Sequence, residues 1–230
     1  DIAAVLSGIQ DKDVVFIDEI HRINKVCEEA LYSAMEDGFI MITIGSNDGQ
    51  GKQVRLTLPS FTLIGATTRA GMLSKPLQDR FGIVRKLEYY HPEELARIVM
   101  ATAAKYEISL TQDQAFDIAK RSRGTPRIAN NCVARVRDMA YAKYDGMVED
   151  STVTEALNLA GISENGLTEE DYQLIASLSH QKPVGLQTLS CILGEAEDTI
   201  TEVLEPYLIM QGYVEKTPRG RILTDKGAKL

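Results

Sequence analysis

The feature that most constrains the fold is the stretch from Asp13 to Arg22, where an apolar run ends in two adjacent carboxylates. The run Val14 to Ile17 is short and rich in β-branched residues, which is typical of a strand buried inside a parallel α/β sheet. Asp18 and Glu19 follow at the carboxyl end of that strand, where open α/β sheets place their ligand crevice. Two ionised carboxylates are costly to hold there without a cation or a polarised water. The sequence therefore predicts an α/β fold with a polar site at this sheet edge.

The arrangement is that of a Walker B motif. We expect Asp18 to support Mg²⁺ through its water shell, and Glu19 to orient and deprotonate the water that attacks a γ-phosphate. The alternative is a strand that simply ends in a solvated acidic turn. His21 lies two residues further on, but because no other His or Cys stands near it, the sequence favours a hydrogen-bonding role over metal ligation.

A second buried strand is predicted at Phe61 to Gly65, and it also ends in polar side chains. We expect the Thr68 hydroxyl to hydrogen-bond the attacking water or the γ-phosphate. Upstream, Phe39 to Ile44 and Gln53 to Leu58 alternate apolar and polar residues across a Gly-rich loop, which indicates a β-hairpin. This hairpin is either a partner-docking insertion or a plain extension of the sheet.

A short helix containing Arg80 and a strand at Val84 to Leu87 are expected next. Arg80 is either an ordinary surface residue or, in a ring-forming ATPase, the finger that reaches into the neighbouring subunit's site. The planar fork of an arginine suits phosphate oxygens.

From His91 onward the pattern changes to helices, and four of them up to residue 160 predict a small helical domain. Arg127 stands in the first turn of the third helix, where it either reaches bound nucleotide or remains a solvated surface group. After a short linker at Gly161 to Gly166, three helices and a strand, basic turn and strand at Tyr213 to Thr224 are typical of a winged helix. We expect this wing to contact the DNA backbone without sequence specificity, although winged helices also dock proteins.

Composition limits the class of protein. The 230 residues are 44% hydrophobic and 25% charged, as in an ordinary globular protein, and the net charge of −8 argues against a uniformly basic coat for nucleic acid. Three widely spaced cysteines form neither a disulfide framework nor a metal cluster, which suits a reducing cytosol. No apolar run approaches the ~18 residues of a membrane span, and no signal peptide is recognisable.

Several strings together resemble the RuvB family of bacterial Holliday-junction branch-migration motors. The most specific are Gly-Ala-Thr-Thr-Arg at 65–69 and Arg-Gly-Thr-Pro-Arg at 123–127. The full set comprises Val15 to Arg22, Ala34 to Asp37, Leu63 to Gly71, Asp79 to Gly82, Arg121 to Asn130, Glu205 to Ile209 and Thr217 to Arg221.

The resemblance implies an α/β, partial AAA+ P-loop NTPase core with an inserted β-hairpin at residues 1–90, followed by a small helical lid at 91–160 and a winged-helix DNA-binding domain at 161–230. It also implies ATP-driven branch migration in recombination and repair, with ATP and Mg²⁺ as cofactors. The expected partners are duplex DNA at Holliday junctions, RuvA bound through the hairpin at 39–58, RuvC as a further candidate, and copies of the same chain in a hexameric ring. The implied location is the bacterial cytoplasm, without a membrane.

By residue match, Asp18 and Glu19 are the Walker B pair, Thr68 the sensor-1 residue, Arg80 the finger acting in trans and Arg127 the sensor-2 residue of the lid. Glu36 and Asp37 match a nucleotide-adjacent pair at the subunit boundary. Tyr90 matches a tyrosine near bound nucleotide. Three further residues match the DNA-contacting wing, namely Lys216, Arg219 and Arg221.

Four residues depart from the family pattern. Gly38 replaces an aromatic residue, which weakens the case for a nucleotide contact by the preceding acidic pair. Lys216 replaces a wing arginine, while Gln78 and Asn131 stand where arginine is common.

The sequence has no Gly-rich loop with a Lys-Ser/Thr to hold the phosphates. The nearest string, Gly45 to Lys52, is one residue off in spacing and has Gln53 in place of Ser/Thr. We therefore expect a chain that lacks its N-terminal part and alone does not bind or hydrolyse ATP well. The alternatives are another AAA+ role, such as a clamp-loader-like subunit, and an ATP-independent DNA-binding or scaffold relative without the P-loop.

Overall fold

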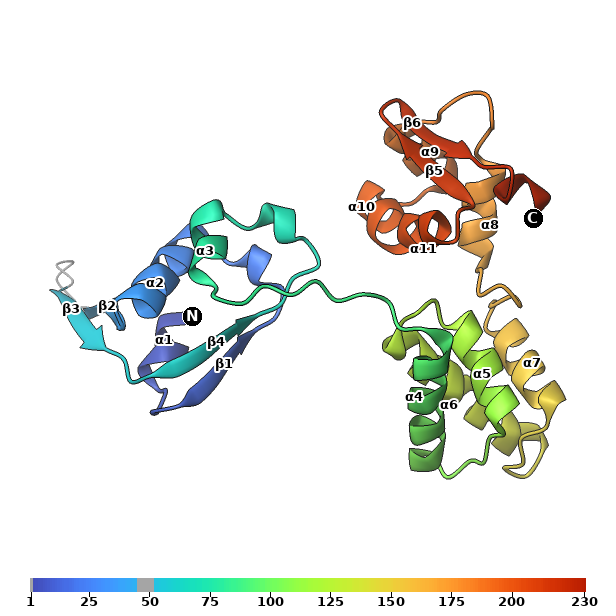
Figure 1. Ribbon diagram of the computed structural model, residues 1–230, viewed down its shortest axis with the longest axis horizontal. Helices are drawn as coiled ribbons and strands as arrows, with labels where there is room; N and C mark the ends of the chain where they lie inside the picture. The colour runs from blue at the N-terminus through green and yellow to red at the C-terminus, as the bar shows by residue number, and fades with distance from the viewer. Residues whose placement is uncertain (1, 45–51) are drawn as a thin grey trace. The chain divides into compact units, whose positions relative to one another are not determined.

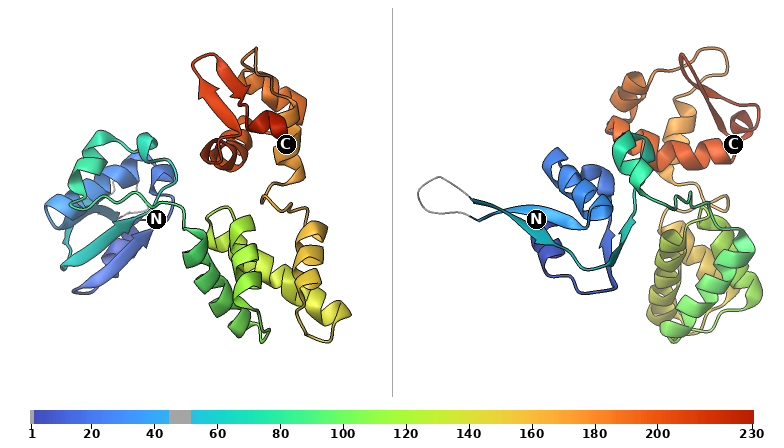
Figure 2. Two further views of the ribbon diagram at one scale, coloured as in Figure 1. Left: turned by 45° about the vertical axis from the view of Figure 1, so that its right-hand side comes forward. Right: turned by 60° about the vertical axis from the view of Figure 1, so that its left-hand side comes forward.

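The computed structural model describes residues 2–44 and 52–230, which form two compact units with a boundary between Lys86 and Leu87 (Figure 1). Each unit is described by itself below. Figure 2 gives two further views of the elements.

The first unit is built on two parallel strands, β1 (Asp13–Ile17) and β4 (Phe61–Gly65), which pair in register from Asp13 with Phe61 to Ile17 with Gly65. The helices α1 (Ile2–Ser7), α2 (Lys25–Glu36) and α3 (Lys75–Arg80) contribute to its core. The fully buried large side chains of this core are Leu6, Ile20, Leu31, Ile40 and Leu77.

The predicted buried strand is covered on one face only. Val15 is 9% exposed, whereas Val14 and Phe16 are 62% and 60% exposed. The strand predicted from the apolar run is confirmed, and the prediction that this strand is fully buried is wrong. Parallel sheets are usually covered on both faces, and no layer of the first unit's described residues lies on this second face.

The predicted hairpin forms from β2 (Phe39–Ile44) and β3 (Lys52–Thr57), paired antiparallel from Phe39 with Thr57 to Ile44 with Lys52. Its tip carries the Gly-rich string at 45–52, of which only Lys52 is among the described residues. The hairpin forms a sheet separate from the β1–β4 pair, which favours an insertion over an extension of that sheet. The strand expected at Val84 to Leu87 is absent, since no described strand pairs with these residues, and Val84 and Leu87 are exposed.

The second unit begins with the four expected helices, α4 (Pro92–Lys105), α5 (Gln112–Arg121), α6 (Pro126–Lys143) and α7 (Asp150–Leu159). Local sequence fixes their starts. Thr111 and Gln114 form a reciprocal capping box on α5, and proline opens α4 and α6, where its missing N–H costs nothing. One core joins the four helices, centred on Leu95, Val99, Ile118, Val133 and Leu157.

The rest of the second unit is the expected winged helix. Its helices are α8 (Glu169–Ala176), α9 (Leu186–Leu193) and a long helix that runs from α10 (Glu197–Thr199) through a π-helical turn, η3 (Ile200–Leu204), into α11 (Glu205–Met210). Strands β5 (Val214–Thr217) and β6 (Gly220–Leu223) form the wing, and Val184 bridges the outer side of β6 at Arg221. Gly220 has a φ of +140°, and a Cβ there would lie 2.3 Å from the Val184 carbonyl oxygen, so this close approach requires glycine.

No helix within residues 2–44 and 52–230 has the length and apolar character needed to cross a membrane.

Candidate ATPase site and nucleic-acid interface

The carboxyl end of β1 bends sharply at the predicted Walker B pair. Glu19 has left-handed backbone angles, φ 49° and ψ 45°, which are uncommon for a residue with a side chain. Its N–H donates to Asp18 Oδ1 over 3.0 Å. Such a conformation costs on the order of 1–3 kcal/mol and persists where the surrounding structure enforces it, often at functional sites.

Two backbone hydrogen bonds hold this bend against the end of β4. Ala66 N–H donates to the Ile17 carbonyl over 2.9 Å, and Ile20 N–H donates to the Ala66 carbonyl over 2.9 Å. The two polar strand ends therefore meet at one edge, as parallel pairing requires.

The structure brings the predicted residues Glu19 and Thr68 together at this edge. Thr68 Oγ1 donates to Glu19 Oε2 over 3.4 Å, and His21 Nδ1 lies 3.2 Å from the same Oε2. His21 Nδ1 also lies 2.8 Å from Thr67 Oγ1, and its side chain is only 5% exposed. The hydrogen-bonding role predicted for His21 is confirmed. The part that Thr67 plays was missed, although its hydroxyl beside Thr68 after a buried strand was a signal for it.

The donor set at this edge fits Mg²⁺ chemistry, because Mg²⁺ prefers oxygen ligands and keeps several of its waters. Asp18, Glu19 and Thr68 supply carboxylate and hydroxyl oxygens. Among the described residues, no cluster of three or more His, Cys, Asp or Glu side chains could hold a metal ion. Support of the ion by Asp18 through water stays a prediction, and a phosphate-cradling loop has no counterpart in the 230 residues.

The structure also brings Arg80 and Glu36 together. Arg80 Nη2 lies 2.5 Å from Glu36 Oε2, Nη1 donates to the Pro76 carbonyl over 2.9 Å, and the guanidinium lies 4.5 Å from the Tyr32 ring centroid. The Arg80 Nε is buried without a hydrogen-bond partner. Asp37 follows at the exposed C-cap of α2. Arg80 is therefore folded back onto its own chain, and an exposed Glu36 partner of this kind is worth only about 0–1 kcal/mol.

Tyr90 and Arg127 belong to the second unit, where one turn between α5 and α6 relates them. Tyr90 N–H donates to the Gly124 carbonyl over 2.9 Å, and Arg127 is exposed in the first turn of α6. Gly124 has a φ of +69°, and a Cβ there would come within 2.7 Å of Tyr89 Cβ. The glycine of the string at 123–127 is therefore required by its backbone angle and by its close approach to Tyr89.

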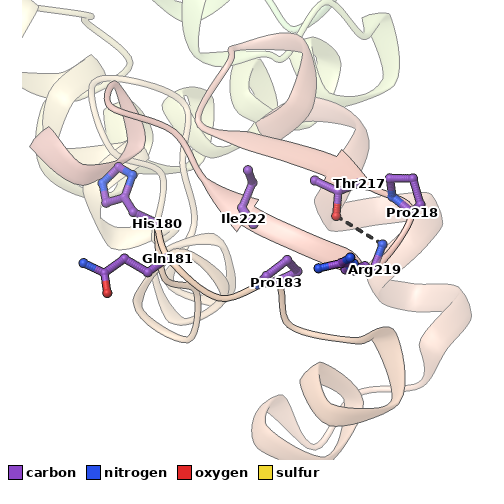
Figure 3. A pocket seen from close by; sticks show the side chains of 7 residues that line it. All are labelled: His180, Gln181, Pro183, Thr217, Pro218, Arg219 and Ile222. Atoms are coloured by element: carbon purple, nitrogen blue, oxygen red, sulfur yellow. Dashed lines mark hydrogen bonds between the residues drawn. The ribbon is translucent and has the colours of Figure 1, made fainter.

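The wing presents Lys216 and Arg219 to solvent. Figure 3 shows Arg219 at the tip of the hairpin, where its N–H donates to Thr217 Oγ1 over 3.3 Å. A shallow pocket beside the tip is lined by His180, Gln181, Pro183, Thr217, Pro218, Arg219 and Ile222.

Arg221 is buried, whereas a residue that contacts DNA must be exposed to solvent. Its side chain is 8% exposed and pairs with Glu205, which is 3% exposed. Nη2 donates to Glu205 Oε2 over 3.0 Å, and Nε donates to the other carboxylate oxygen. The strand β6 pairs with β5 on one side and with Val184 on the other, and Arg221 in this strand is buried. The structure therefore corrects the placement of Arg221 on the exposed wing.

The first unit has polar residues at the carboxyl ends of two parallel strands, as nucleotide-binding α/β domains do. Together with the four-helix lid and the winged helix, it defines an AAA+ fold with an appended winged-helix domain. Three family models match the chain consecutively: the RuvB P-loop domain over residues 1–87, the RuvB AAA lid domain over 90–163 and the RuvB C-terminal winged helix domain over 164–230. The chain belongs to the RuvB family.

Individual relatives agree with this assignment. The chain is 47% identical over 229 residues to the Holliday junction branch migration complex subunit RuvB of Fusobacterium nucleatum, covering 98% of this chain and 69% of that protein. The solved Thermotoga maritima RuvB Holliday junction branch migration motor is 41% identical, with a TM-score of 0.84, and the match covers 100% of this chain and 72% of that one. A mutant of the same T. maritima protein matches with a TM-score of 0.87 at 41% identity, covering 100% and 73%. The fold class and the resemblance predicted from the sequence are confirmed.

Proposed function

We propose that this RuvB homologue is the ATP-driven motor subunit that moves Holliday junctions together with RuvA. The observation that carries the proposal is the sheet edge at which Glu19 meets Thr68 and His21, beside Asp18. A carboxylate held by two hydrogen-bonding groups at the carboxyl end of a parallel strand is the arrangement that water activation needs.

In this proposal the side chains at the edge divide the work. When bound, ATP would supply the phosphoryl group, and Mg²⁺ would neutralise part of the charge on its phosphates. Asp18 holds the water shell of the cation, Glu19 accepts a proton from the attacking water, and Thr68 orients that water. His21 holds the Glu19 carboxylate in place.

Arg80 is proposed as the finger that acts on a neighbouring copy in a hexameric ring. Its present partner, Glu36, is 61% exposed and easily exchanged for a phosphate oxygen. Asp37, Tyr90 and Arg127 are proposed to lie near nucleotide, although Tyr90 and Arg127 are in a different unit from Asp18.

The two outer elements are proposed as partner sites. The β2–β3 hairpin, which forms its own sheet, is the proposed RuvA contact, and Lys216 and Arg219 on the wing are the proposed contacts to duplex DNA. RuvC is a further candidate partner, and the bacterial cytoplasm is the expected compartment.

The test is branch migration of a synthetic four-way junction by the protein as it occurs in its source cell, called the native protein below, with RuvA and ATP. The Glu19→Gln variant removes the proton acceptor and keeps the shape, and the matched control is Glu29→Gln, which alters an exposed glutamate on α2. The proposal expects migration with wild type and the control, and loss with Glu19→Gln. Equal migration by all three would refute it.

A second candidate is an ATP-independent DNA-binding or scaffold relative, for which the exposed Lys216 and Arg219 on the wing would suffice. If the native protein binds junction DNA but shows no ATP turnover, this candidate replaces the first.

A further inference from the structure

The turn that joins α5 to α6 holds an arginine in a strained conformation. Arg123 has a φ of +53°, in the left-handed region, and the turn closes with Thr125 N–H donating to the Ser122 carbonyl over 2.9 Å. A residue with a side chain keeps this conformation only where its surroundings hold it. The surroundings of Arg123 include the winged helix.

The Arg123 side chain leaves the lid and enters the winged-helix domain. Its Nε donates to the Gly166 carbonyl over 2.8 Å, and Nη2 pairs with the Asp171 carboxylate. The guanidinium also lies 4.9 Å from the Tyr207 ring centroid. Arg123 is 11% exposed and Asp171 is fully buried, so the pair is shielded from solvent.

The winged-helix residues that contact Arg123 are held in place by hydrogen bonds of their own. Asp171 Oδ2 accepts from Thr168 N–H over 2.7 Å and from Thr168 Oγ1 over 3.1 Å, which fixes the carboxylate at the start of α8. The Tyr207 hydroxyl donates to the Asn165 carbonyl over 2.8 Å, which orients the ring. Asp171 Oδ1 is buried without a partner, so the carboxylate depends strongly on Arg123 for charge compensation.

The segment expected to be a linker is also tied down. Ser163 N–H donates to the Leu167 carbonyl and Gly166 N–H to the Ser163 carbonyl, each over 2.9 Å. A Cβ on Gly166 would lie 2.9 Å from the Arg121 carbonyl oxygen and 3.1 Å from the Tyr207 hydroxyl. The lid and the winged helix are thus in close contact at this point.

The same turn holds the residues proposed to lie near nucleotide. Gly124, the next residue after Arg123, accepts the hydrogen bond of Tyr90 N–H, and Arg127 follows in the first turn of α6. A displacement of this turn therefore acts on Tyr90, on Arg127 and on the winged helix together.

We propose that Arg123 is a positioning residue that makes the lid and the winged helix move as one body, so that nucleotide-driven movement of the lid is transmitted to the bound DNA. The mechanical part of the proposal stands on the Arg123–Asp171 joint, and its consequence for DNA movement rests on the proposed function.

The first experiment measures the joint itself. Spin labels are placed on native Cys191 of α9, which is exposed, and on Ala142→Cys of α6, with Cys27→Ser to remove a competing thiol. The distance distribution between the labels is expected to be narrow for the otherwise native chain and broad for Arg123→Gln. An unchanged distribution overturns the proposal, whatever the ATPase activity.

The second experiment measures coupling in the native protein with RuvA and junction DNA. Arg123→Gln is expected to retain DNA affinity within about twofold, while the number of junctions moved per ATP falls about tenfold or more. The control is Arg135→Gln, which alters a largely exposed arginine on α6. Junctions moved per ATP equal to wild type would overturn the proposal.

A second variant guards against a simple folding defect. Asp171→Asn keeps an oxygen to cap α8 but removes the charge, and it is expected to reproduce the uncoupling with the winged helix still folded. The double variant is expected to be no worse than either single variant, since both break one interaction. If the two substitutions lowered the number of junctions moved per ATP additively, the proposed joint between Arg123 and Asp171 would be contradicted. If the native wild type hydrolyses no ATP, the proposed function fails, and the label distances still decide the joint.

Discussion

The buried pair of Arg221 and Glu205 makes a quantitative prediction about the winged helix. Replacement of Arg221 by Met preserves the approximate length of the side chain but leaves the Glu205 carboxylate, 3% exposed, without its cation. Removal of one partner from a buried pair costs about 3–5 kcal/mol, because an uncompensated charge stays behind. For a domain of this size, about 1 kcal/mol corresponds to ~4–8 °C in Tm, so a loss of at least ~12 °C is expected.

The assay is thermal unfolding followed by circular dichroism, with DNA binding measured in parallel by fluorescence anisotropy at several salt concentrations. The double variant Arg221→Met with Glu205→Leu is expected to recover most of the stability, because neither charge is then buried alone. The control Arg219→Gln is expected to keep the Tm and to weaken DNA binding. If Arg221→Met kept the Tm and weakened DNA binding as Arg219→Gln does, our placement of Arg221 would be refuted.

Further predictions concern other parts of the chain. Arg219→Ala should weaken DNA binding and reduce the slope of log affinity against log salt by about 1, whereas an unchanged slope would exclude a phosphate contact at this residue. His21→Ala should lower the kcat of ATP turnover by about 10–100-fold in the native protein, since displaced catalytic groups cost rates of this size; turnover equal to wild type would show that Glu19 needs no such support. Burial raises the pKa of the Cys132 thiol, so less thiolate forms at a given pH, and alkylation followed by mass spectrometry should modify exposed Cys191 well before Cys132. Hydrogen bonds from Ser74 and Tyr32 lower the pKa of Glu28 below its ordinary value. Their stabilisation is present above the pKa of an unfolded glutamate and is lost as the pH falls through the lowered pKa, so Glu28→Gln should flatten this part of the curve of unfolding free energy against pH.

Local signals in the sequence were sufficient for most of the fold. The capping box at Thr111 and Gln114, the prolines that open α4 and α6, and the turn between β5 and β6 act over a few residues, and each marked an element that the structure contains. The adjacent carboxylates after the first apolar strand likewise placed Glu19 at the end of that strand. Because strand ends in a parallel sheet share one edge, the sequence also indicated that Glu19 and Thr68 lie close together.

The features that the sequence could not supply depend on residues far apart in the chain. Nothing near Arg221 distinguishes it from Arg219, and only its packing on Glu205 shows that it is buried. Thr67 lies 46 residues from His21, and Asp171 lies 48 residues from Arg123, so neither of these two contacts follows from local spacing.

Burial and pairing of strands have the same limit. The apolar residues at Val14 and Phe16 carry no information on which layers are present to cover them. The run Val84 to Leu87 has strand-like composition, but a strand needs a neighbour to pair with, and the described residues provide none.

The central claim is that Glu19 activates water for ATP hydrolysis in this RuvB homologue, and the most direct test is the rate of phosphate release. The native protein is assayed with Mg²⁺–ATP and junction DNA, as wild type, as Glu19→Gln and as the Glu29→Gln control, with ATP binding measured separately. We expect Glu19→Gln to bind ATP and release phosphate at least ~100-fold more slowly, because general-base catalysis contributes about 10²–10⁴-fold. Phosphate release by Glu19→Gln at the wild-type rate would contradict the account.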